Sequence, residues 1–218
     1  MGGTLIERPP APENAQLYSE ELGIRIERIC DRELFKWFIA SLLFGARVTP
    51  IIAKQGYFAL ARNKLLTPRQ ISNAGEKEIY ELLLQAGYVR SAKAKSSQLV
   101  KASQRLLDMY GGSLEKLHDA AESPRHLEAL LRGFPGVGPV TANIFLRELR
   151  PFWPKADPAP LERVIDHARA QGVDLNATPR KNLDFVKLET GLVRELAKTG
   201  ESRKFAHAGG GPSKRKAT

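Results

Sequence analysis

Apolar residues recur at intervals of three and four along much of the chain, which is the spacing of one face of an α-helix. The clearest run follows Asp31, a residue that often caps a helix N-terminus, and it ends at Gly45. It consists of Leu34, Phe35, Phe38, Ile39, Leu42 and Leu43. We therefore predict a buried helix between Asp31 and Gly45.

Capping patterns predict further helices. Thr67-Pro68 and Ser123-Pro124 each place a hydroxyl side chain before a proline, and a proline in the first helical position loses no hydrogen bond. Apolar stripes end at Gly87 and at Gly111. No stretch alternates apolar and polar residues as a half-buried strand would. The predicted fold class is all-α.

Both ends of the chain differ in composition from the middle. Residues 1–20 are rich in proline and glycine, which predicts an arm. Residues 201–218 hold a run of glycines followed by Lys214, Arg215 and Lys216, which predicts a flexible basic tail. Residues 21–200 are expected to form the fold, and amphipathic helices at 185–189 and 192–196 would pack its C-terminal part.

The net charge points to a polyanionic partner. The chain has 34 Lys and Arg against 24 Asp and Glu, a formal net charge of +10. Such a charge favours nucleic acid, because each phosphate that a cation neutralises releases condensed counterions. An ordinary basic protein with a basic tail is the alternative.

Other classes of protein are excluded by composition. Cys30 is the single cysteine of the chain, so a disulfide framework, a four-cysteine iron–sulfur cluster and a cysteine-rich zinc site are excluded. The four histidines are scattered and have no spacing typical of a metal site. No apolar run approaches the roughly 20 residues that span a bilayer, and no secretory signal is evident, so we expect a cytoplasmic or nuclear protein.

The segment from Leu131 to Asn143 carries the strongest chemical signal. It reads Leu-Arg-Gly-Phe-Pro-Gly-Val-Gly-Pro-Val-Thr-Ala-Asn, and we expect a helix from about Ser123 to be followed by a turn and a second helix from about Pro139 to Leu149. Glycines at 136 and 138 would let a phosphate approach the amides at the start of the second helix. The alternative to an anion site is a tight helix–helix connection that happens to use two glycines.

This string resembles the helix-hairpin-helix of the HhH-GPD superfamily of DNA glycosylases, which includes endonuclease III, the adenine glycosylase and the alkyladenine glycosylases. In that family a Gly/Pro-rich loop follows and ends in a catalytic aspartate. The stretch Pro151-Phe152-Trp153-Pro154-Lys155-Ala156-Asp157 is similar to it. Residues 34–45 and 87–94 resemble an early buried helix and a later helix start of the family. The resemblance covers roughly residues 30–165.

The resemblance implies a monofunctional glycosylase in which Asp157 stabilises the oxocarbenium-like state or activates water. Bifunctional members have a nucleophilic lysine where this chain has Val140, so strand cleavage is not expected. A single cysteine cannot hold the iron–sulfur cluster that some members of the family carry. The resemblance is therefore nearer to the branches that lack this cluster. Residues 158–160 depart from the Thr-His that follows the aspartate in endonuclease III.

The same resemblance implies the remaining site residues. The expected DNA-binding residues are Gly136, Val137, Gly138, Val140, Thr141, Arg47 and Lys93. Trp153 and Phe152 could line the base pocket or simply pack the loop. The backbone carbonyls of Arg132, Phe134 and Val137 would hold a monovalent cation, and no other cofactor is expected. Lys95, Lys101 and Arg105 could face phosphate or solvent.

The expected architecture is two helical lobes with a DNA cleft between them. One lobe would comprise residues 32–130, and the other residues 21–31 with 131–200, including the hairpin at 131–149. The predicted function is excision of a damaged base from duplex DNA by a monomer. A helix-hairpin-helix protein that binds DNA without catalysis is the alternative.

Overall fold

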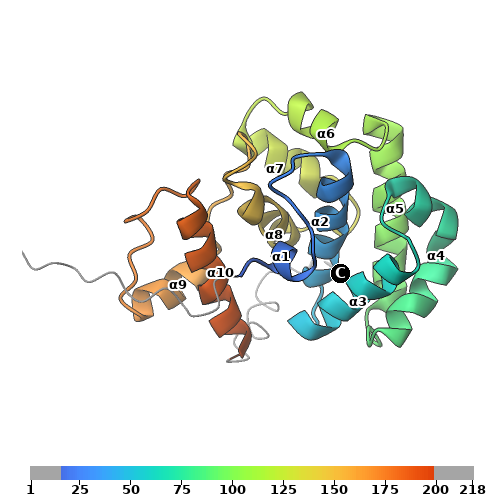
Figure 1. Ribbon diagram of the computed structural model, residues 1–218, viewed down its shortest axis with the longest axis horizontal. Coiled ribbons are helices and arrows are strands. Elements are labelled where there is room, and N and C mark those ends of the chain that lie inside the picture. The colour runs from blue at the N-terminus through green and yellow to red at the C-terminus, as the bar shows by residue number, and fades with distance from the viewer. Residues whose placement is uncertain (1–15, 199–218) are drawn as a thin grey trace, which may run out of the picture.

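The computed structural model describes residues 16–198, and within this range the chain forms ten helices and no strand (Figure 1). The helices are α1 (Tyr18–Glu21), α2 (Asp31–Phe44), α3 (Pro50–Arg62), α4 (Pro68–Gln85), α5 (Ala92–Tyr110), α6 (Leu114–Ala120), α7 (Pro124–Arg132), α8 (Pro139–Leu149), α9 (Glu162–Ala170) and α10 (Leu183–Lys198). The predicted all-α class is therefore confirmed for the described residues.

Helix α2 occupies the centre of the larger part of the molecule. Most of its residues are buried, and it packs against α3 and α8. Its span agrees with the prediction from the apolar spacing. The N-cap is Cys30 rather than the predicted Asp31, because the Asp31 carboxylate accepts a hydrogen bond from the Glu115 amide at 3.1 Å. Asp31 thus connects the start of α2 to α6.

The predicted capping residues act as expected. Thr67 accepts a hydrogen bond from the amide of Gln70 at the start of α4, and Ser123 accepts one from the amide of His126 at the start of α7. Gly111 ends α5 in the left-handed conformation. These local signals fix where the helices begin and end.

The C-terminal region contains fewer helices than the sequence pattern suggested. The two amphipathic segments at 185–189 and 192–196 belong to one continuous helix, α10. Both segments have their apolar residues on the same face, because the helical period continues through residues 190 and 191.

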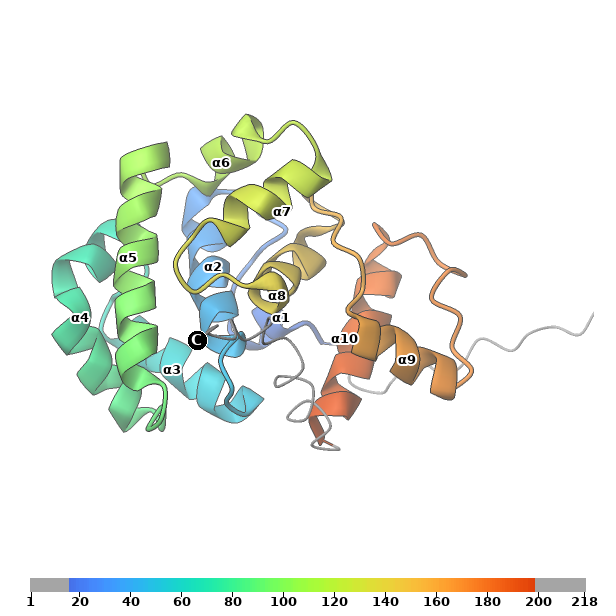
Figure 2. The same ribbon diagram turned by 180° about the vertical axis from the view of Figure 1, so that it is seen from behind.

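Buried side chains form two hydrophobic clusters. The larger extends from Leu17 to Ala156, includes most of α1 to α8, and also takes in Val186. The smaller consists of Val164 and Ala168 on α9 with Leu192 and Leu196 on α10. Accordingly, α9 and α10 lie together at one end of the molecule, with α3, α4 and α5 at the other (Figures 1 and 2).

The N-terminal segment is joined to α8 by a buried carboxylate. The side chain of Glu148 accepts hydrogen bonds from the amides of Tyr18 at 3.1 Å and Ser19 at 3.0 Å. These amides lie at the start of α1 and have no partner within that short helix. The residues before α2 are thereby attached to the larger cluster.

Some predicted segments are only partly tested. Residues 1–15 of the predicted arm and the whole predicted tail, 201–218, lie outside the described residues. The division into lobes at 32–130 and 131–200 stays a prediction. None of the helices between residues 16 and 198 is long and apolar enough to cross a bilayer.

Candidate nucleic-acid interface and the Asp157 loop

The turn between α7 and α8, residues 133–138, is called the hairpin turn here. Its two apolar residues, Phe134 and Val137, are buried, and the Val137 amide donates to the Phe134 carbonyl at 3.0 Å. Gly136 has a φ of +81°, a conformation that glycine adopts without strain. A Cβ at this position would lie 2.7 Å from the Gln98 side chain of α5, so the turn sits tightly on that helix.

The end of the hairpin turn is open to solvent. Gly138, Pro139 and Val140 are exposed, and a Cβ on Gly138 would have no neighbour within 4 Å. No side chain caps the N-terminus of α8. The amides in the first turn of α8 therefore point outward with the positive end of the helix dipole, an arrangement that suits an anion.

Thr141 and Arg47 are brought to this place by contact between α8 and the end of α2. Thr141 is buried, and its hydroxyl donates to the Gly136 carbonyl at 3.4 Å. A Cβ on Gly45 would lie 2.1 Å from that hydroxyl oxygen, so the end of α2 touches the first turn of α8. Arg47, which is exposed, follows two residues later.

Two other basic residues considered for contact with the DNA backbone, Lys93 and Arg105, lie on α5. Lys93 is exposed in the first turn of α5, more than one helical turn before Gln98. Arg105 lies beside the turn, with its guanidinium 5.7 Å from the centroid of the Phe134 ring. The sequence pattern indicated Arg105 only as one of several basic residues. Its position next to Phe134 depends on how α5 packs.

Of the three residues predicted to hold a monovalent cation, Arg132 ends α7, and Phe134 and Val137 lie in the hairpin turn. The Phe134 carbonyl accepts a hydrogen bond from the Val137 amide. Nη1 of Arg132 lies 4.0 Å from Oε1 of Glu128. Among the residues that the structure describes, no group of three or more His, Cys, Asp or Glu side chains could hold a metal ion. The monovalent cation stays a prediction.

Asp157 lies in the segment between α8 and α9, residues 150–161, which we call the Asp157 loop. Its Oδ2 accepts a hydrogen bond from Nη2 of Arg180 at 2.8 Å. Its Oδ1 is buried without a hydrogen-bond partner and lies 3.9 Å from Nε of Arg150. The side chain is 23% exposed, so the carboxylate is held between two guanidinium groups at the edge of the protein.

Arg150 holds this loop from within the protein. Its guanidinium is fully buried, donates to the Pro158 carbonyl at 2.6 Å and forms an ion pair with Glu189 of α10. It also lies over the Phe185 ring, 5.2 Å from the centroid. Burial lowers the pKa of Arg150, and the Glu189 carboxylate opposes that shift. The Glu189 carboxylate therefore compensates the positive charge of Arg150 inside the protein, where that charge is removed from water.

The loop folds back along α8. Nδ2 of Asn143, in the middle of that helix, donates to the Ala159 carbonyl at 2.8 Å. Trp153 is buried and stacks on His118, with ring centroids 4.5 Å apart and an interplanar angle of 16°. Phe152 packs against the larger hydrophobic cluster. These two aromatic residues pack the loop against the core.

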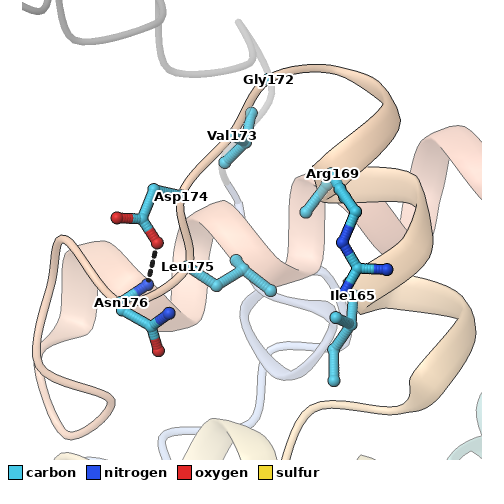
Figure 3. Close-up of a pocket in the computed structure, with 8 residues that line it drawn as sticks. Ile165, Arg169, Gly172, Val173, Asp174, Leu175 and Asn176 are labelled. Carbon is cyan, nitrogen blue, oxygen red and sulfur yellow. Dashed lines mark hydrogen bonds between the residues drawn. The ribbon is translucent and has the colours of Figure 1, made fainter.

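Two cavities lie beyond the loop. The first, about 340 Å³, lies between α9 and the segment after it, where Leu175 points toward Ile165 (Figure 3). The second, about 400 Å³, shares Ile165, Leu175 and Asn176 with the first. Its other lining residues are Pro160, Arg180 and Phe185. Neither Trp153 nor Phe152 lines these two cavities.

Several residues of this site had no signal in the sequence. Arg180 is 23 positions beyond Asp157, and Glu189 is 39 positions beyond Arg150. Neither belongs to a recognisable motif. Only the packing of α10 and of the segment before it against the Asp157 loop brings them together.

Comparison of the chain with models of protein families, with curated proteins and with solved structures finds no match in any of the three.

Proposed function

We propose that this protein is a monofunctional DNA glycosylase of base excision repair, with two helical lobes of the HhH-GPD type. The observation that carries the proposal is the arrangement around α8. The open amide end of the hairpin turn begins this helix, and the Asp157 loop folds back along it through the bond from Asn143 to Ala159. The start of α8 thus carries the open amides, and the loop that carries the carboxylate contacts the middle of the same helix.

The hairpin turn would hold the DNA backbone. Exposed amides at the start of α8 can donate to a phosphate without a side chain in the way, because Gly138 has open space around it. Gly45 contacts Thr141, and Arg47 follows Gly45 by two residues, so Arg47 would add a positive charge beside the start of α8. Contacts of this kind are independent of base sequence.

Asp157 would act on the sugar. When the bond between C1′ and the base nitrogen breaks, positive charge develops on the deoxyribose, and a fixed carboxylate stabilises it. The water oxygen then bonds to C1′, and the proton that this water releases ends on the departing base. The target base must leave the helix stack for this reaction, as it does in other enzymes that act on bases.

The absence of an amine at position 140 supports hydrolysis without strand cleavage. Val140 is 39% exposed at the start of α8, and its side chain can form no Schiff base. We therefore assign the protein base excision alone. A substrate in duplex DNA would place it in the nucleoid or the nucleus.

A second candidate function is DNA binding without catalysis. The observation that favours it is the ion pair between Asp157 and Arg180, with Arg150 nearby. A carboxylate that is compensated by guanidinium groups exerts a weaker field on a sugar than a free one. Catalysis would require Arg180 to turn toward the substrate. Its side chain is 44% exposed, so it has room to move.

Excision from labelled duplexes, each with one modified base, tests the proposal. We expect a product that appears only after alkali, and we expect Asp157→Asn to abolish it while duplex affinity holds or rises. The substituted asparagine has nearly the same shape and can still accept a bond from Arg180. Unchanged excision in Asp157→Asn would refute the catalytic role, and binding without excision of any base would favour the second candidate.

A further inference from the structure

The second cavity has both apolar and polar walls and includes one cationic group. Pro160, Ile165, Leu175 and Phe185 supply apolar surface, and Asn176 and Arg180 supply polar groups. Its volume of about 400 Å³ lies within the usual range of small-molecule sites, about 300–1,000 Å³. In such sites a few polar groups fix the orientation of the ligand.

The cavity is next to the carboxylate that we assign to catalysis. Arg180 lines the cavity and also donates to Asp157 at 2.8 Å, so a single guanidinium touches both. Pro160 belongs to the Asp157 loop itself. Phe185 lies under Arg150, which holds the same loop. The guanidinium of Arg180 would therefore lie between a ligand in the cavity and Asp157.

We propose that the second cavity receives the extruded base, and that Arg180 selects neutral bases with carbonyl or ring-nitrogen acceptors over cationic alkylated bases. The proposal rests on the glycosylase function and names its substrate class. It assigns the base site to the α9–α10 side of the Asp157 loop, and it assigns specificity to a residue outside the hairpin motif.

The donor pattern of arginine supports this choice. A guanidinium has five N–H donors and no acceptor, and the donor that binds Asp157 is released when Arg180 turns toward the substrate. Two parallel N–H groups fit two adjacent acceptors, as in the recognition of guanine O6 and N7. A carbonyl-bearing base would thus be bound through its acceptor edge. The same donors would stabilise negative charge on the base as the glycosidic bond breaks.

Charge supports the exclusion of alkylated purines. Among the described residues lining the second cavity, Arg180 carries the charge, whereas Asn176 and the four apolar residues are neutral. Once Arg180 has turned from Asp157 toward the cavity, a base made cationic by alkylation would meet its like charge in partly desolvated surroundings. Asp174, which lines the first cavity, accepts a bond from the Asn176 amide at 2.8 Å. That carboxylate does not line the second cavity.

Excision kinetics of the full chain test the inference. Duplexes with uracil, 8-oxoguanine and cationic 7-methylguanine would be compared for wild type, Arg180→Ala and Arg169→Ala. We expect kcat/KM for the better neutral base to exceed that for 7-methylguanine at least tenfold. In Arg180→Ala the ratio should fall below about threefold. Arg169 lines only the first cavity, so Arg169→Ala should leave the ratio unchanged and serves as the matched control.

Two results separate failure of the inference from failure of the proposed function. Preferred excision of 7-methylguanine, or an unchanged ratio in Arg180→Ala, would overturn the inference while leaving a glycosylase. If no duplex is cut, the nucleosides deoxyuridine, deoxyguanosine and cationic 7-methyldeoxyguanosine would be titrated at mildly acidic pH against the ring resonances of Phe185, which lines only the second of the two cavities. Shifts with the neutral nucleosides alone would uphold the selectivity of the cavity, and equal shifts or none would overturn it.

Discussion

The hairpin turn and the Asp157 loop both adjoin α8, yet they are built in different ways. The hairpin turn owes its shape to neighbours in sequence: a bond between Val137 and Phe134, two buried apolar residues and a glycine with positive φ. The Asp157 loop owes its shape to side chains from α8, from α10 and from the segment before α10. A local motif suffices for the first, whereas the second needs the tertiary fold.

The two regions also differ in electrostatics. The end of the hairpin turn exposes amide dipoles with no side-chain cap. Two arginines and two carboxylates meet at the Asp157 loop: Arg150 and Asp157 belong to it, and Arg180 and Glu189 come from later in the chain. Arg150 and Glu189 are fully buried. One region thus presents uncompensated positive potential to a ligand, and the other balances its charges internally. Substitutions should therefore affect binding in the first region and stability in the second.

The largest effect is expected from Glu189→Gln, which leaves Arg150 buried without its nearest counter-charge and with only Asp157 at 3.9 Å. Removal of one partner from a buried ion pair costs about 3–5 kcal/mol of the free energy of unfolding, because the remaining charge stays desolvated. Urea unfolding measures this loss. Glu195→Gln is the control on the same helix, since that carboxylate is 36% exposed, and it should change stability by less than about 1 kcal/mol.

A double variant sharpens the same test. Arg150→Met with Glu189→Leu removes both charges and should recover much of the stability that Glu189→Gln loses. Equal destabilisation in the single and double variants would mean that apolar packing and the bond to Pro158, rather than charge balance, hold the Asp157 loop.

The next effect concerns α5, the helix beneath the hairpin turn. Lys95 lies on the buried face of α5 and is 5% exposed, and its side-chain ammonium has no hydrogen-bond or ion-pair partner among the described residues. Burial lowers its pKa from 10.5 to about 8. The unfolded chain keeps this proton up to a higher pH than the folded chain. The lysine therefore destabilises the fold fully below pH 8, and this penalty disappears as the pH rises toward 10.5.

Lys95→Met should accordingly stabilise the protein near pH 7 by up to about 3 kcal/mol, the free-energy equivalent of the lowered pKa. The difference from wild type should shrink between pH 8 and 10.5. Urea unfolding over this range measures it. Lys93→Met, two positions away on the exposed face, should show no such pH-dependent difference. A constant gap between Lys95→Met and wild type would contradict the buried-amine explanation.

A smaller effect is expected from Gly136→Ala in the hairpin turn. The added Cβ would lie 2.7 Å from the Gln98 side chain at a φ of +81°. Backbone strain and the contact together should cost about 1–3 kcal/mol in urea unfolding. Gln98→Ala in the same chain should relieve the contact with the end of the Gln98 side chain, but neither the contact with its Cβ at 2.9 Å nor the strain. Full recovery in that double variant would show that the positive φ and the Cβ contact contribute little.

The helices of the larger cluster were predictable because their signals are local. The apolar spacing of residues 34–43 and the hydroxyl caps Thr67 and Ser123 gave α2, α4 and α7 their positions. The hairpin turn was predictable for the same reason. Asp31 shows where prediction from local signals fails. The sequence predicts an N-cap at Asp31, but its carboxylate instead accepts a hydrogen bond from the amide of Glu115 in α6.

The surroundings of Asp157 could not be predicted from the sequence. No motif around Arg180 or Glu189 distinguishes them from charged residues that lie on a protein surface. Both acquire their partners through the packing of α10. The sequence also left open whether Trp153 lines a pocket, and its stacking on His118 shows that it packs the core instead. Side chains from distant segments decide these positions.

The smallest change in stability is expected from Gly138→Asp, and it separates binding from folding at the hairpin turn. Gly138 has φ −88° and ψ −178°, a conformation that any N-cap residue adopts, and its Cβ would meet no atom within 4 Å. The new carboxylate could accept the amides of Val140 or Thr141 and interact with the helix dipole, which should stabilise the protein by about 0.5–1 kcal/mol.

The same carboxylate would occupy the place that a phosphate needs. Duplex affinity should therefore fall for every sequence alike, although the protein is more stable, because the contact carries no sequence information. Fluorescence anisotropy with three unrelated duplexes, together with urea unfolding, measures both effects. Gly138→Asn caps α8 without a charge and should keep more affinity than Gly138→Asp. Loss for one sequence only, or unchanged affinity in Gly138→Asp, would mean that the open end of α8 does not bind the DNA backbone.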